Sequence, residues 1–157
     1  MSYTQAFFDV IKGEIEIYQD LLDLSYKKTD VIIAGEVKEL DKITKVEGQL
    51  LNKILELEEK REFLLSEFGG SSLKDAKILD TFTENEKLSL QKLQSLFFDV
   101  LKKLQERNDL NTSLIKQSLE YINYSISLIS DVLQEDNGIY GDKGGKKKYT
   151  NLIDKKV

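Results

Sequence analysis

The feature that most constrains this chain is the absence of proline from all 157 of its residues. Proline is the strongest helix breaker, and Leu, Ile, Glu and Lys dominate the composition. An all-β chain would need turn signals at short intervals, and the sequence lacks them. The sequence therefore predicts an all-α protein made of a few long helices.

Capping residues and glycines mark the first two helices. Ser2 and Gln5 have the spacing of a capping box. A heptad seam with alternating spacings of three and four then begins at Phe8, Ile11 and Ile15. Gly35 supplies a helix stop or tight turn. A second helix is predicted over residues 36–68, before Gly-Gly-Ser-Ser begins a loop.

The last helix is predicted to be the longest. Thr83 and Glu86 form a second capping-box pattern, and nothing interrupts the helical periodicity from there to about residue 135. The predicted fold is an antiparallel three-helix coiled-coil bundle with a long last helix and a short extra helix in the 69–83 connection.

The chain divides into two regions that differ in composition. Residues 1–135 are predicted to form the helical bundle, and residues 136–157 a flexible Gly/Lys-rich C-terminal tail. The tail holds six lysines and three aspartates, although the whole chain has a net charge of −5. The acidic body disfavours nucleic acid as the main partner, because phosphate binding needs clustered cations.

Missing residue types narrow the chemistry. Without His and Cys, the chain has no imidazole base, thiol nucleophile, disulfide or His/Cys zinc site. No phosphate-binding loop of the Gly-Lys-Ser/Thr kind is present. We therefore expect a binding protein and not an enzyme, with no catalytic residues, metal or cofactor. Apolar runs are far shorter than the ~20 residues needed to span a bilayer, and no signal-peptide pattern is seen, so we expect a cytoplasmic protein without membrane insertion.

Two charged residues interrupt the apolar pattern of the second helix. Glu47 and Arg61 occupy its seam, and their separation of about 21 Å along a helix prevents them from pairing with each other. Each needs a partner on another helix, or lies at the edge of the seam with its stem packed and its charge in water. The sequence favours the second interpretation.

The last helix carries more apolar surface than one seam requires. Beside a seam that ends in Tyr121, Leu128 and Val132 lies a second, aliphatic one, here called the stripe: Ile115, Leu119, Ile122, Ile126, Ile129 and Leu133. A helix that touches two neighbours in a bundle would also need a broad apolar face.

Helix lengths favour a partner for the stripe. The first two helices are predicted at roughly 48 Å each and the last at roughly 78 Å. If the last helix starts beside the end of the second, it passes the Gly35 turn by about 20 residues, which are the ones that carry the stripe. An exposed apolar stripe of this kind indicates a protein-binding surface.

Several segments together resemble the FlgN-type flagellar export chaperones. They are Asn108-Asp-Leu-Asn111 with Leu114, Ser118 and Ile122; Ala34-Gly-Glu-Val-Lys-Glu-Leu40 with Glu47 and Arg61; and Ile139-Tyr140-Gly141 with the basic end. The resemblance covers essentially the whole chain. It implies that Glu47, Arg61, Asn108, Asn111 and Ser118 are structural motif residues.

The resemblance also implies partners. FlgN-type chaperones hold the C-terminal helical segments of the hook-associated proteins FlgK and FlgL and deliver them to the export gate. Their client-binding region lies in the C-terminal part, which corresponds here to the stripe. Tyr140 and Gly141 would bind the cytoplasmic domain of the gate protein FlhA. The alternative is a self-associating coiled-coil scaffold or tether, in which the stripe pairs with its own copy. A monomer or a weak homodimer that a client displaces would favour the chaperone, and a stable dimer would favour the scaffold.

Overall fold

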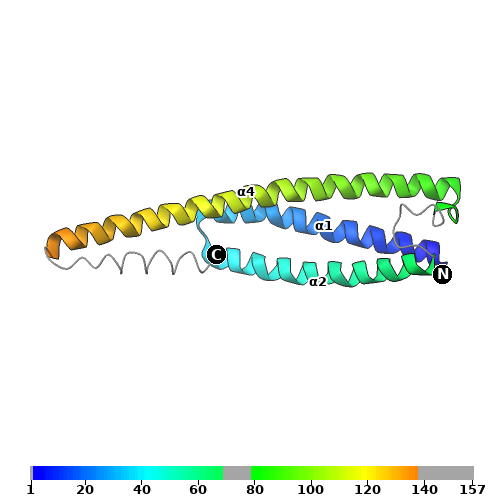
Figure 1. Ribbon diagram of the computed structural model, residues 1–157, viewed down its shortest axis with the longest axis horizontal. Helices are drawn as coiled ribbons and strands as arrows, with labels where there is room; N and C mark the ends of the chain where they lie inside the picture. Colours follow the sequence, from blue (N-terminus) through cyan, green and yellow to red (C-terminus); the bar gives the residue numbers. More distant parts are fainter. Residues whose placement is uncertain (1, 69–78, 138–157) are drawn as a thin grey trace. The chain divides into compact units, whose positions relative to one another are not determined.

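The computed structural model describes residues 2–68 and 79–137, and these form long helices without strands. Helix α1 spans Tyr3–Ala34, α2 spans Val37–Glu67 and α4 spans Glu84–Asn137 (Figure 1). Their lengths are 32, 31 and 54 residues. The predicted all-α, three-helix fold with a long last helix is confirmed. The predicted extra helix falls largely on residues 69–78, outside the described part of the chain.

The helix boundaries follow the local signals in the sequence. The Ser2 hydroxyl accepts a hydrogen bond from the backbone N–H of Gln5 at 3.2 Å. Gly35 ends α1 with φ of 70°, in the left-handed region that glycine adopts without steric cost. Thr83 and Glu86 exchange both bonds of a capping box, at 3.1 and 3.2 Å, directly before α4.

Two ion pairs cross the hairpin that α1 and α2 form. Arg61 on α2 donates a 2.5 Å hydrogen bond to Glu14, a side chain on α1 that is fully buried. Nearer the Gly35 turn, the Lys28 Nζ on α1 lies 3.0 Å from the Glu47 Oε1 on α2. Less than a quarter of either side chain is exposed. The edge interpretation of Glu47 and Arg61 is therefore wrong, because each has a charged partner on the neighbouring helix.

Apolar layers alternate with these ion pairs at intervals of seven residues. Phe7 packs edge-on against Phe68, with ring centroids 6.1 Å apart, one heptad from the Glu14–Arg61 pair. The same antiparallel register brings Leu21 level with Ile54, and both are buried. The sequence placed the α1 seam one position away, on Phe8 and Ile15. Those residues are buried, but the heptad of Phe7, Glu14 and Leu21 was missed.

Burial makes the Glu14 carboxyl group unusual in its electrostatics. Loss of solvent raises its pKa above the ordinary value, the Arg61 guanidinium opposes the rise, and the nearby Glu58 carboxylate adds to it. Within the described residues, the second carboxylate oxygen of Glu14 has no hydrogen-bond partner. Arg61 therefore compensates the buried charge only in part.

The first half of α4 packs alongside α1 and runs in the same direction (Figure 1). Tyr18 and Phe97 meet edge to face at 5.4 Å between centroids. Further along, the guanidinium of Arg107 lies 4.2 Å from the centre of the Tyr26 ring and donates to the Thr29 hydroxyl at 3.4 Å. The up-down-up order of a three-helix bundle follows from these contacts.

The core is richest at the end away from the Gly35 turn. Phe7, Phe8 and Phe82 gather there with Leu65 and Leu90, all less than one-tenth exposed. Toward the turn, polar residues are buried alongside Ile32 and Ile43: the hydroxyls of Ser25 and Thr29 donate to backbone carbonyls within α1. The described residues divide into two compact units, with the boundary inside α4 between Leu110 and Asn111.

Candidate functional site

The second unit begins inside α4, at Asn111, and it contains the predicted stripe. Ile122 is 44% exposed, Ile129 61% and Leu133 55%. The other stripe residues, Ile115, Leu119 and Ile126, are half-buried. Large apolar side chains normally lose most of their exposed surface on folding, so this much exposure over three turns is a candidate binding surface.

The exposed apolar surface is wider than the stripe. In the neighbouring seam, Tyr121 is 72% exposed, Leu128 47% and Val132 56%. The helical period that groups them is real, but periodicity does not say whether a neighbouring helix is present to cover it.

Charge is scarce on this part of α4. Residues 111–134 contain only three charged residues, Lys116, Glu120 and Asp131, whereas the 31 residues of α2 contain fourteen. The rest of this segment consists of nine aliphatic residues, two tyrosines, and Ser, Thr, Asn and Gln. The segment therefore resembles neither a solvated surface helix nor a membrane helix.

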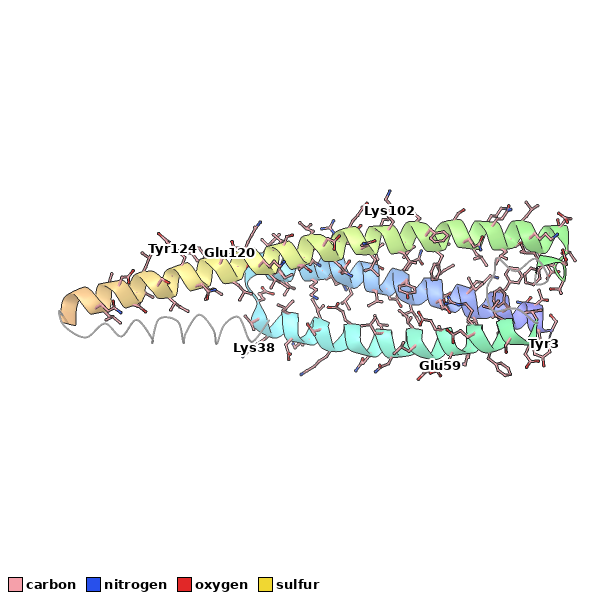
Figure 2. The ribbon with its side chains drawn as sticks, viewed as in Figure 1. Tyr3, Lys38, Glu59, Lys102, Glu120 and Tyr124 are labelled. Carbon is pink, nitrogen blue, oxygen red and sulfur yellow. The ribbon has the colours of Figure 1, made fainter. Side chains whose placement is uncertain are left out.

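The few charges lie away from the stripe. At about 100° per residue, Lys116, Glu120 and Asp131 fall roughly 100–160° around the helix from its centre. Figure 2 shows Glu120 and Tyr124, one turn apart, on the same side of α4. Within residues 111–134, one side of α4 is consequently aliphatic and uncharged.

The five motif residues occupy different environments. Glu47 and Arg61 belong to the hairpin ion pairs described above. On α4, Asn108 is exposed and Asn111 is buried, at 3% exposure. The Ser118 hydroxyl donates to the carbonyl of Leu114 at 3.0 Å, one turn earlier in the same helix. None of these arrangements tests the motif roles, which stay predictions.

The predicted gate-binding residues belong to the C-terminal tail. Tyr140 and Gly141 lie outside the described residues, as does the tail that contains them. Across residues 2–68 and 79–137, no group of three or more acidic, His or Cys side chains is placed to hold a metal ion. None of the helices in that part of the chain is long and apolar enough to cross a bilayer.

Comparison with known proteins decides the family. The family model described as FlgN protein matches residues 1–148. This chain belongs to the FlgN family. A relative in Bacillus subtilis (strain 168), described as the uncharacterized protein YvyG, is 28% identical over 138 residues, covering 87% of this chain and 85% of that protein. No solved structure matches the chain. The expected resemblance to FlgN is thus confirmed.

Proposed function

We propose that this FlgN-family protein is a cytoplasmic flagellar export chaperone. It binds the C-terminal helical segments of the hook-associated proteins FlgK and FlgL and delivers them to the type III export gate. The observation that carries the proposal is the exposed, uncharged apolar surface of α4 around Ile122 and Ile129. Family membership supports the role, and the stripe supplies a surface for the client.

Burial of aliphatic surface is sufficient to hold such a client. Each Leu or Ile that is moved from water into a packed interface contributes about 1.5–3 kcal/mol. Ordering the client segment costs several kcal/mol, so a few such anchors give useful affinity and still allow release. An amphipathic client helix laid on the stripe would match the common helix-in-groove mode of recognition. This role needs no catalytic group.

Helix lengths are consistent with this role. The lengths used to predict that α4 passes the hairpin are confirmed, at 32, 31 and 54 residues. That α4 extends beyond the Gly35 turn depends on how the two units are placed, and it stays a prediction. The exposed side chains of Ile122, Ile129 and Leu133 support the client surface.

A triple substitution tests the surface without disturbing the bundle. Ile122, Ile129 and Leu133 are each more than two-fifths exposed, so changing all three to Ser removes little packing. We expect loss of binding to FlgK and FlgL C-terminal segments in calorimetry, with an unchanged helical circular dichroism spectrum. The control is Tyr124→Ser, which removes a large aromatic side chain, 62% exposed, from the other side of α4. Retained binding in the triple variant, or equal loss in the control, would refute the assignment.

Delivery to the export gate is assigned to a different residue. We place contact with the cytoplasmic domain of FlhA at Tyr140 and Gly141, on the resemblance of the Tyr-Gly element alone. A tyrosine among glycines offers a large contact area with few torsions to fix. Tyr140→Ala should weaken binding to the FlhA domain and leave client binding unchanged. If both bindings fall together, the two functions are not separable in this way.

A further inference from the structure

The positions that flank the stripe differ from those of ordinary coiled coils. With Ile122 and Ile126 at the two core positions of a heptad, the flanking positions are those that usually carry Glu and Lys and set partner choice. In this chain they are Lys116, Ser118, Asn123, Ser125, Ser130 and Val132. Five of the six are uncharged, so an incoming helix would find almost no ionic contacts beside the aliphatic seam.

The same chain uses charge differently in its own hairpin. Glu14–Arg61 and Lys28–Glu47 lie two heptads apart and mark one register of α1 against α2. A slip by one heptad would place Glu14 opposite Phe68 or Ile54 and leave its charge without a partner. Buried ionic and polar groups are a well-attested means of fixing helix register. The core positions of the stripe hold no charged residue that could fix a register in this way.

We infer that the stripe recognises an amphipathic helix with a broad aliphatic seam and uncharged Ser, Thr, Asn or Gln flanks, in more than one heptad register. The inference rests on the proposed function and specifies the chemistry of its client. A helix with charged flanks would bring its charges against Ser and Asn side chains, where no counter-charge offsets their partial desolvation. Recognition by apolar area alone is also nearly independent of ionic strength, because screening acts on charges.

Two synthetic peptides test the inference with the full chain. Both have the same 28-residue Leu/Ile seam and the same charged outer positions, and they differ only at the flanks: Ser and Gln in one, Glu and Lys in the other. Binding is followed by fluorescence anisotropy at peptide concentrations where each peptide alone sediments as a monomer. We expect the neutral-flanked peptide to change its Kd less than about twofold between 50 and 500 mM NaCl. The charged-flanked peptide should bind at least about fivefold more weakly.

A register test uses the same assay. Moving the seam of the neutral-flanked peptide by one heptad relative to its ends should change the Kd less than about threefold, because the stripe offers equivalent core positions along its length. A loss greater than about tenfold would show that one register is selected and would overturn that part of the inference.

Variants of the chain supply the matched control. Ser118→Glu with Ser125→Glu puts two carboxylates beside the stripe, and should make binding of a Lys-flanked peptide salt-dependent. Ser113→Glu with Gln117→Glu adds the same charge on the opposite side, at exposed positions, and should have no such effect. Tighter binding of the charged-flanked peptide to the unaltered chain, or a salt effect above about tenfold, would overturn the inference. So would failure of both peptides to bind while a FlgK C-terminal segment still binds, and that outcome would leave the proposed function standing.

Discussion

The Glu14 carboxylate on α1 is held 2.5 Å from the Arg61 guanidinium on α2, although 47 residues of sequence separate them. Glu14 is fully buried, whereas the Arg61 side chain keeps 28% of its surface exposed. The pair therefore joins the inside of the hairpin to its surface. It also fixes the register that brings Phe7 to Phe68.

Removing Arg61 alone should be much worse than removing both partners. Arg61→Leu leaves the buried Glu14 charge uncompensated and should lower the free energy of unfolding by about 3 kcal/mol. The double variant Glu14→Leu/Arg61→Leu should recover most of this loss, because no charge is left in the core. Urea denaturation followed by circular dichroism measures both values.

An exposed ion pair provides the control for that experiment. Lys45 and Asp41 lie 3.1 Å apart on the surface of α2, with 74% and 65% of their side chains exposed. Lys45→Ala should change the free energy of unfolding by less than about 0.5 kcal/mol. If the double hairpin variant is no more stable than Arg61→Leu, lost packing and not the stranded charge explains the effect.

The raised pKa of Glu14 gives a pH dependence with a definite sign. The folded chain holds the Glu14 proton more tightly than the unfolded chain, whose carboxyl titrates near the ordinary 4.5. The contribution of Glu14 to stability is therefore fully present below that pH, and it is lost as pH rises through the folded-state pKa. As pH rises from 4 to 7, the unfolding free energy of the unaltered chain should fall relative to that of the Glu14→Gln variant, whose side chain does not titrate. A difference that is flat, or that moves the other way, contradicts the burial effect.

The Lys28–Glu47 pair should behave as a reversible contact. Glu47→Lys places two ammonium groups where opposite charges now lie 3.0 Å apart, and should cost about 1 kcal/mol of unfolding free energy. Adding Lys28→Glu restores opposite charges and should recover the loss to within about 0.5 kcal/mol. A double variant as unstable as the single one would mean that the two side chains do not interact in solution.

Two glycines should respond in opposite directions to the same substitution. Gly35 has φ of 70° with open space around the missing Cβ, so Gly35→Ala carries only backbone strain and should cost about 1–2 kcal/mol. Gly48 lies inside α2, also in open space, and Gly48→Ala should stabilise the chain by about 0.5–1 kcal/mol. Thermal unfolding of both variants makes the comparison. Stabilisation by Gly35→Ala would show that the turn is not left-handed.

Local signals in the sequence predicted the helix ends well. Gly35 and the Thr83–Glu86 capping box act within a few residues, so the pattern alone contains the information. The partners of Glu47 and Arg61 are not local. Finding them required the hairpin register, and the register depended on assigning the heptad of Phe7 and Glu14, which the apolar pattern of Phe8 and Ile15 obscured. A buried Glu in a predicted seam gives no hydrophobic signal.

The candidate site was predictable only in part for a related reason. Helical period identified the stripe and its neighbour, but both would look the same if they were packed in a core. Tyr121 and Val132 are exposed, and whether such a helix face is covered is a tertiary property that periodicity does not contain. The scarcity of charge around Ile122 was readable in the sequence and is the signal that would have separated a partner surface from a solvated face.

The same exposed stripe could pair with a second copy of this chain, as in a self-associating scaffold, so the oligomeric state separates the two roles. An export chaperone must leave the stripe available, and we expect a monomer or a weak dimer that a FlgK C-terminal segment displaces. Sedimentation velocity of the full chain at low and high concentration, with and without that segment, measures this. In the scaffold role, the dimer would persist on dilution and the FlgK segment would not displace it.

The triple Ser variant at Ile122, Ile129 and Leu133 should abolish any dimer that uses the stripe, while Tyr124→Ser should leave it intact. A stable dimer unaffected by the triple variant would place self-association elsewhere and leave the stripe free for a client.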